Sequence, residues 1–339
     1  MSNEQNEQIV LASRPEGMPN EENFRYETVE TNRPDEGQVL LKTLYLSVDP
    51  YMRGRMSDAK SYVAPFQIDE PLNGTVVAEV IESRSEQLEV GDKVTGFLEW
   101  KKFNVADGHT VRKIDDKIAP ISAYLSVLGL TGLTAYFGLY DIGEPKEGET
   151  VVVSGAAGAV GTIAGQLAKL KGCRVVGIAG SDDKIDYIVN ELGFDAGLNY
   201  KKSDNLQKEL EEACPNGVDV YFDNVGGEIS DAVMNLLNTH ARIPLCGAIS
   251  SYNRTDGDLG PRVQTKLIKT RAKIQGFVLN DYQDRFQEGT EFLAQYVQND
   301  QLKYEETIVE GFESVTDAFF GLFQGTNLGK QLVKVADPS

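Results

Sequence analysis

Residues 1 to about 115 carry short hydrophobic runs rich in β-branched and aromatic residues, and Gly, Pro, Asn and Asp separate one run from the next. Runs this short, with turn-forming residues between them, are typical of strands rather than helices. Their spacing predicts a small β-barrel or β-sandwich at the start of the chain. The runs are QIVLASR (8–14), QVLLKTLYLSV (38–48), TVVAEVIES (75–83), DKVTGFLEW (92–100) and HTVRKI (109–114).

The pattern changes at Thr150, from which runs of strand length alternate with longer segments of helical spacing. This alternation predicts an α/β fold with a parallel, doubly wound sheet. Near GKQLVKV (329–335) the chain is strand-like again, and we expect this last segment to rejoin the first domain. The expected divisions are 1–125, 126–300 and a returning segment, 301–339. The predicted strands are 150–155, 173–180, 196–200, 218–225, 241–249 and 272–279, and the predicted helices are 159–172, 181–193, 205–213 and 227–237.

One uncharged stretch, residues 118–140, is long enough to span a bilayer. It contains Pro120, glycines and several hydroxyl side chains, and it stands alone in an acidic chain, so we interpret it as buried helix and turn at a domain junction. The amino-terminal MSNEQNEQIV lacks the basic and apolar regions of a signal peptide. We therefore expect neither export nor a membrane partner.

Charge and cysteine content narrow the classes of function. The formal net charge is −19 and no basic face is visible, which argues against a nucleic-acid partner. Three widely separated cysteines favour a reducing compartment, hence the cytoplasm, over a disulfide framework. The chain has only two histidines, His109 and His240, and no Cys/His cluster has the spacing of zinc ligands, so we expect no metal.

A glycine-rich turn follows the first strand of the alternating region, in VVVSGAAGAVG (151–161). Its glycines let the backbone approach a pyrophosphate, and the helix that follows offers its amino-terminal N–H groups. A tight strand–helix turn with no ligand is the alternative, but the complete βαβ context favours dinucleotide binding. The residues concerned are Gly155, Gly158, Ala159, Val160 and Gly161.

The second strand of this unit ends in Ala179 and Gly180, where an NAD-binding protein usually has an acid that holds the ribose diol. Ser181 and Lys184 follow, and a hydroxyl and a cation suit the 2′-phosphate of NADP. Asp182 and Asp183 oppose this reading unless they face solvent or cap the next helix. The sequence therefore favours NADP over NAD.

Several longer motifs resemble the zinc-free medium-chain dehydrogenase/reductase family. They most resemble its branch of leukotriene B4 12-hydroxydehydrogenases, or prostaglandin reductases, and alkenal double-bond reductases. The resemblance covers nearly the whole chain and implies a GroES-like β-barrel domain with a Rossmann domain, NADPH as cofactor and a homodimer. The motifs are LSVDPYMRGRM (46–56), LTGLTAYFGL (130–139), GAAGAVGTIAGQLAKLKGCRVVGIAGSDDK (155–184), YFDNVGGE (221–228), CGAISSYN (246–253) and GTNLGKQLVKV (325–335).

The resemblance also assigns cofactor contacts. It implies that Lys184 and Tyr200 meet the 2′-phosphate region, although a solvated lysine and a packed tyrosine are the ordinary alternatives. Asn224 and Asn327 match further contacts, with turn residues as the alternative. The remaining residues that match are Cys246, Gly247, Ala248, Ile249, Ser250, Ser251, Tyr252, Phe277, Val278 and Leu279.

The absence of zinc ligands and of a Tyr-x-x-x-Lys pair argues against carbonyl–alcohol interconversion. Reduction of a C=C bond conjugated to a carbonyl needs neither zinc nor such a pair, because hydrogen-bond donors aimed at the carbonyl oxygen suffice to stabilise the enolate. Tyr252 is the candidate donor. The resemblance places Tyr51 at the substrate pocket, and a packed tyrosine beside a turn is an equal alternative.

We therefore expect NADPH-dependent reduction of small α,β-unsaturated aldehydes and ketones. An NADPH quinone reductase and a catalytically silent NADPH-binding sensor or structural protein are the two alternatives.

Overall fold

The computed structural model describes residues 5–339, so the first four residues of the amino-terminal stretch considered above lie outside it. Contacts divide the described chain into two units. One contains residues 5–125, Glu306–Asn327 and Gln331–Ser339, and the other contains Ser126–Glu305 with Leu328–Lys330.

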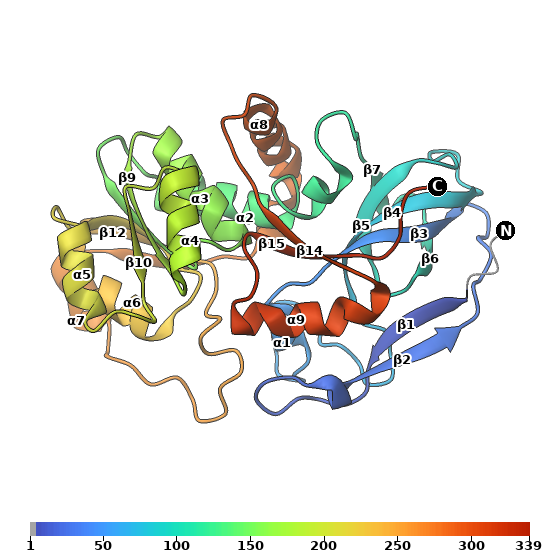
Figure 1. Ribbon diagram of the computed structural model, residues 1–339, viewed down its shortest axis with the longest axis horizontal. Coiled ribbons are helices and arrows are strands. Elements are labelled where there is room, and N and C mark those ends of the chain that lie inside the picture. The colour runs from blue at the N-terminus through green and yellow to red at the C-terminus, as the bar shows by residue number, and fades with distance from the viewer. Residues whose placement is uncertain (1–4) are drawn as a thin grey trace. The chain divides into compact units, whose positions relative to one another are not determined.

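The first unit is built on a seven-stranded sheet and a separate two-stranded ribbon, β1–β2 (Figure 1). Strand β3 is central to the sheet and pairs antiparallel with β15, β4 and β6. Its inward side chains pack on a core that includes Trp100 and the face of α9 that carries Phe319. The elements are β1 (Asn6–Leu11), η1 (Glu21–Asn23), β2 (Phe24–Val29), β3 (Gln38–Ser47), α1 (Met52–Arg55), β4 (Asn73–Ser83), β5 (Lys93–Glu99), β6 (Phe103–Asp107), β7 (Val111–Lys113), η2 (Ile121–Leu125), β14 (Glu306–Glu310), η6 (Phe312–Ser314), α9 (Val315–Gln324) and β15 (Lys330–Lys334).

The second unit is a six-stranded parallel sheet in the order β10-β9-β8-β11-β12-β13. When the six strands are numbered in chain order from β8, this is the 3-2-1-4-5-6 order of the Rossmann fold, with its switch point between β8 and β11. The elements are α2 (Leu130–Phe137), η3 (Gly138–Gly143), β8 (Thr150–Ser154), α3 (Ala159–Leu170), β9 (Arg174–Ala179), α4 (Asp182–Asp186), η4 (Tyr187–Glu191), β10 (Ala196–Asn199), α5 (Leu206–Ala213), β11 (Val218–Phe222), α6 (Gly227–Val233), β12 (Leu237–Leu245), α7 (Gln264–Thr270), β13 (Lys273–Gly276), η5 (Leu279–Arg285) and α8 (Phe286–Gln298).

These units confirm the predicted fold class, an α/β parallel sheet with a second, antiparallel domain. All five residues of β8 are buried, as a central strand covered on both faces requires. The uncharged stretch 118–140 forms η2 and α2, which are largely buried. Among residues 5–339, no helix is both long enough and apolar enough to cross a membrane.

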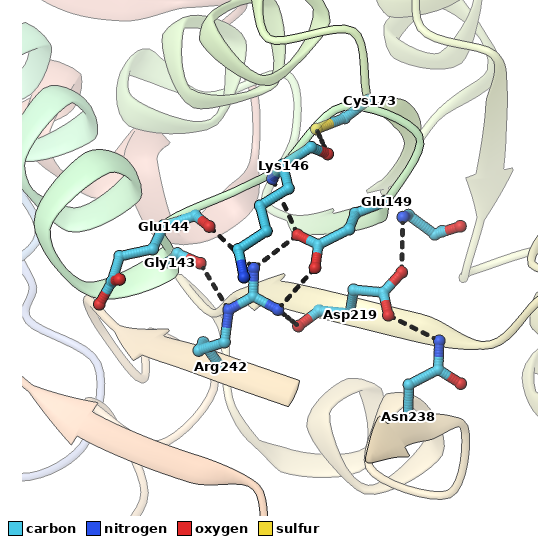
Figure 2. A network of polar contacts seen from close by, with 9 residues as sticks. Gly143, Glu144, Lys146, Glu149, Cys173, Asp219, Asn238 and Arg242 are labelled. Atoms are coloured by element: carbon cyan, nitrogen blue, oxygen red, sulfur yellow. Dashed lines mark hydrogen bonds and ion pairs between the residues drawn. The ribbon is translucent and has the colours of Figure 1, made fainter. Parts of the chain in front are cut away.

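The amino edge of the parallel sheet is held by Arg242 on β12 (Figure 2). Its guanidinium donates to both carboxylate oxygens of Glu149, at 3.0 and 2.5 Å. It also donates to the carbonyls of Gly143 and Glu144, where η3 ends. One half-buried side chain therefore ties β12 to the start of β8 and to a helix terminus.

Some predicted boundaries were wrong. The predicted helix 227–237 ends at Val233, because Leu237 pairs with Val218 and begins β12. The predicted strand 241–249 ends at Leu245, because the next two N–H groups donate to the Asp223 carbonyl and turn the chain away. The predicted helix 181–193 is α4 followed by a π-helical segment, η4. Elements that the pattern did not predict are η1, β2, α1, β6, α7, η5, α8, β14, η6 and α9.

Candidate active site

The carboxyl ends of the six parallel strands all meet at one edge of the sheet, where doubly wound folds bind ligands. The predicted cofactor residues of this unit follow these strand ends directly. Gly155 comes after β8, Ser181 after β9, Tyr200 after β10, Asn224 after β11, Cys246 after β12 and Phe277 after β13.

The glycine-rich turn after β8 lets a ligand approach the backbone closely. Gly155 has φ of +60°, which disfavours side chains with a Cβ. A Cβ on Gly161 would lie 2.3 Å from the Gly155 carbonyl oxygen. Gly158 precedes the first turn of α3 and has no side chain with which to cap it. The N–H groups of Ala159, Val160 and Gly161 therefore point out of the helix end, where an anion can accept them.

A second glycine segment lies against this turn. The Gly329 N–H donates to the Ala157 carbonyl at 2.8 Å, and Gly329 forms a parallel bridge with Gly158. A Cβ on Gly329 would lie 2.0 Å from the Glu305 carbonyl oxygen, so this close passage requires glycine. Asn327 is two residues earlier and belongs by its contacts to the other unit.

A basic corner forms where β9 and β10 end. Ser181 caps α4 by accepting the Lys184 N–H at 3.4 Å. A Cβ on Gly180 would lie 3.1 Å from the Tyr200 ring and 3.2 Å from the Lys201 side chain, so these groups converge beside the strand end. Burial lowers the pKa of Lys184, and so does the neighbouring charge of Lys201. We did not expect Lys201 from the sequence, although it directly follows Tyr200.

Of the two acids that opposed NADP binding, Asp182 is engaged by other side chains. Asp182 pairs with Lys202 and accepts from the Asn199 amide at 2.7 Å, and these contacts lower the pKa of its carboxyl. Asp183 is exposed. Asp182 is therefore bonded to Lys202 and Asn199 rather than to Lys184.

Asn224 is held by Ser154, whose hydroxyl in turn donates to the buried acid Asp223. The Asn224 amide donates to the Ser154 carbonyl at 2.8 Å, and its N–H donates to the Ser154 hydroxyl at 3.0 Å. Asp223 is 2% exposed, and one of its carboxylate oxygens accepts four hydrogen bonds. The donors are the hydroxyls of Ser154 (3.0 Å) and Tyr221 (2.9 Å) and the N–H groups of Val225 (3.0 Å) and Gly226 (2.9 Å).

The segment after β12 is also hydrogen-bonded to Asp223. The Cys246 and Gly247 N–H groups donate to the Asp223 carbonyl at 2.9 and 3.1 Å. We missed Asp223 in the sequence. Its signal was an acid directly after the apolar run 220–222, a place where a buried carboxylate needs several donors.

Tyr252 folds back over its own loop. The Ala248 N–H donates to the Tyr252 hydroxyl oxygen at 3.2 Å, and a Cβ on Gly247 would lie 3.1 Å from that oxygen. Burial raises the pKa of Tyr252, so its hydroxyl is neutral and keeps its hydrogen. Ser250 donates to the Val225 carbonyl at 2.7 Å and holds the loop beside Asn224.

Two of the predicted contact residues differ in what they can offer a ligand. Cys246 is half-buried, and burial of its thiol raises the pKa to about 12, so the group stays protonated. The Phe277 ring packs inward, since a Cβ on Gly138 would lie 2.6 Å from its edge. Of the residues Phe277, Val278 and Leu279, all half-buried, the first therefore offers chiefly its backbone to a ligand.

Tyr51 lies in the other unit, directly before α1. It is half-buried, and burial raises the pKa of its hydroxyl well above the ordinary value. Within residues 5–339, no group of three or more His, Cys, Asp or Glu side chains is arranged to hold a metal ion.

Comparisons with known proteins agree with this geometry. Residues 7–114 match the N-terminal domain of oxidoreductase family, and residues 159–295 match the zinc-binding dehydrogenase family. A Bacillus subtilis protein provisionally named as an NADP-dependent oxidoreductase is 63% identical over 98% of both chains. The NADPH-dependent curcumin reductase of Escherichia coli is 46% identical, again over 98% of both. The crystal structure of CurA from Vibrio vulnificus in complex with NADPH is 46% identical, with a TM-score of 0.93 over 98% of this chain and 100% of that one.

Proposed function

This chain belongs to the zinc-free medium-chain dehydrogenase/reductase family, and we propose that it uses NADPH to reduce the C=C bond of α,β-unsaturated aldehydes and ketones. NADPH, when bound, supplies the hydride that adds to the β-carbon. All further steps concern what the residues of this chain bind, orient and donate.

We assign NADPH to the carboxyl edge of the parallel sheet. The N–H groups at the start of α3 suit the pyrophosphate, and Asn224 and the 246–252 loop suit the rest of the cofactor. The basic corner suits the 2′-phosphate, because phosphate oxygens accept from hydroxyl and ammonium donors. Its members are Ser181, Lys184, Tyr200 and Lys201.

The observation that carries the catalytic proposal is the state of the Tyr252 hydroxyl. Its oxygen already accepts from the Ala248 N–H, so its own hydrogen remains available to an outside acceptor. Burial keeps the hydroxyl neutral. It can therefore donate to the substrate carbonyl oxygen as negative charge develops there, an interaction worth about 3 kcal/mol in comparable sites.

Four substrates test this function. NADPH oxidation is followed with a 2-alkenal, an enone, a saturated ketone and a quinone, and the products are identified. We expect saturated carbonyl products from the alkenal and the enone and no turnover of the ketone. Turnover of the quinone alone would assign the chain to quinone reduction, and NADPH binding without any turnover would favour a silent sensor.

We also propose that residues 1–125 and 301–339 provide the substrate domain, with Tyr51 and Asn327, and that the protein acts in the cytoplasm as a homodimer. The sparse, unpaired cysteines support a reducing compartment. Strand β13 supports the homodimer, because it is an edge strand of the parallel sheet. Helix α7 is nearby in sequence and has no buried residue, and Ile268 on it is 77% exposed.

A further inference from the structure

Asp182, the first residue of α4, is bonded to the chain that leaves the neighbouring strand β10. One of its carboxylate oxygens accepts from the Asn199 side-chain amide at 2.7 Å, and the other pairs with the Lys202 ammonium. Asn199 is the last residue of β10, and Lys202 lies in the turn that follows it. The two contacts therefore fasten this turn to the first turn of α4.

The Asn199 side chain extends the contact to Lys201. Its amide oxygen accepts the Lys201 N–H at 3.2 Å, and its backbone carbonyl accepts the Lys202 N–H at 3.0 Å. An asparagine bonded in this way to the backbone two residues on closes a turn. Because the same amide must present its nitrogen to Asp182, the carboxylate fixes the orientation in which the amide oxygen faces Lys201.

This turn carries two members of the basic corner. The Tyr200 N–H donates to the Ala179 carbonyl at 3.2 Å, which continues the pairing of β10 with β9. A Cβ on Gly180 would meet both the Tyr200 ring and the Lys201 side chain within 3.2 Å. The path from Asp182 through the Asn199 amide therefore ends at the side chains that line the end of β9.

By its charge alone, Asp182 would weaken the binding of a phosphate at this corner. Its side chain is 61% exposed and that of Lys202 is 69% exposed, so water screens their pair and the pair adds little to the stability of the fold. What the contacts of Asp182 supply is order in the turn from which Lys201 projects. A cation that is already held in place loses less conformational entropy when it binds an anion.

We propose that Asp182 is a positioning residue for NADPH: through Asn199 it orders the turn that carries Lys201, and it thereby raises the affinity for the 2′-phosphate although it is itself an anion. This inference rests on the proposed binding of NADPH at the basic corner. In this role Asp182 contacts neither the phosphate nor the ribose. An acid at the end of β9 would favour NAD by holding the ribose diol, whereas this acid, bonded to the turn after β10, favours NADP.

Fluorescence titration of the full-length enzyme with NADPH and NADH tests the proposal. The variants are Asp182→Ala, Lys201→Ala and the double variant. We expect Asp182→Ala to raise the Kd of NADPH about fivefold and to change the Kd of NADH less than about twofold, because only NADPH carries the phosphate. Since Asp182 acts through Lys201, its removal should add less than about twofold to the effect of Lys201→Ala.

Asp183→Ala is the matched control. Asp183 is exposed in the same first turn of α4, and none of residues 5–339 forms an ion pair or a side-chain hydrogen bond with it. Its removal should leave the Kd of NADPH unchanged or lower it, which is the direction that charge alone predicts. Asp182→Asn keeps an oxygen for the Asn199 amide, so it should recover most of the affinity that Asp182→Ala loses.

Three results would overturn the proposal: NADPH bound by Asp182→Ala at least as tightly as by the parent, equal rises in the Kd of NADPH and NADH, or losses in Asp182→Ala and Lys201→Ala that multiply. Each of them leaves the proposed function standing when the parent binds NADPH and reduces an enone. A parent that binds NADPH no more tightly than NADH would instead contradict the proposed cofactor itself.

Discussion

At the scale of single residues, the proposed preference for NADPH rests on two lysines, Lys184 in α4 and Lys201 just after β10. Only Lys184 follows from the sequence, because its position after the second strand is a property of the βαβ pattern. Lys201 comes from the pairing of β10 beside β9, which brings Tyr200 and its neighbour to Gly180. Such a contact between strands cannot be derived from the spacing of residues within one of them.

The lysines make a direct prediction about the two nicotinamide cofactors. Lys184→Ala and Lys201→Ala should each raise the Kd of NADPH about tenfold or more, because each removes a charge-assisted contact to phosphate. The Kd of NADH should change little, since NADH lacks the 2′-phosphate. Fluorescence titration with both cofactors measures this, and equal losses would show that the lysines support the fold rather than the phosphate.

Tyr252 carries the second residue-scale prediction. Tyr252→Phe should lower kcat on an enone about 100-fold and leave the Kd of NADPH unchanged, because the hydroxyl acts on charge that appears only in the transition state. Since burial raises the pKa of Tyr252 above its ordinary value of 10.0, kcat in the parent should show no loss from this group until pH exceeds that value. An unchanged kcat in the variant would remove Tyr252 from the mechanism.

At the scale of elements, the loops after β11 and β12 are both held by Asp223, the first by its carboxylate and the second by its backbone carbonyl. The pattern predicts both strands, but it extends the second one through residues that form the Tyr252 loop. The bonds from Cys246 and Gly247 to Asp223 explain the difference, because they satisfy two N–H groups outside the sheet ladder. The acceptor lies on the chain that follows the neighbouring strand β11, so the spacing of residues within the second strand cannot predict where that strand ends.

Asp223→Ala should therefore destabilise the protein by about 3 kcal/mol and weaken NADPH binding, since it leaves buried donors without their acceptor. Asp223→Asn is the matched control. Its amide oxygen can replace the carboxylate oxygen that accepts all four bonds, so this variant should lose much less stability and NADPH affinity than Asp223→Ala. Urea unfolding and NADPH titration measure both effects, and equal losses in the two variants would show that the negative charge matters more than the acceptor.

The contacts between Arg242 and Glu149 at the opposite edge of the sheet lead to a prediction about the pH dependence of stability. The hydrogen bonds from Arg242 and the Lys146 N–H lower the pKa of Glu149, although burial, the largest single influence, opposes them. A carboxyl whose pKa is lower in the folded protein than in the unfolded chain stabilises the fold at pH values above its pKa in the unfolded chain. That stabilisation is lost as the pH falls through its pKa in the folded protein.

Arg242→Met should therefore cost about 2 kcal/mol in the free energy of unfolding near neutral pH, less than for a fully buried pair because both partners are partly exposed. The difference from the parent should shrink in acid, where Glu149 is protonated. Urea unfolding at neutral pH and near pH 3 measures this. A difference that stays constant would attribute the loss to the bonds from Arg242 to the Gly143 and Glu144 carbonyls.

At the scale of the whole molecule, the alternation of strands and helices predicts the parallel sheet, and the terminal strand-like segment predicts a return to the first domain. The pattern does not predict α8 and α9. The helical face of α9 is apolar enough to be buried, yet its aromatic residues are as typical of strands as of helices. Only packing against the first unit's core decides between them.

Net charge adds a last prediction, about the proposed homodimer. Each chain carries a formal charge of −19, so two chains in one dimer repel each other over the distance that salt leaves unscreened. If the contact is made by the β13 edge and apolar residues rather than by ion pairs, added salt should strengthen it. Sedimentation velocity at about 20 mM and about 300 mM NaCl should then show a lower dissociation constant at the higher salt, because the Debye length falls several-fold. Dissociation by salt would indicate an interface of ion pairs, and a monomer at every concentration would remove the homodimer.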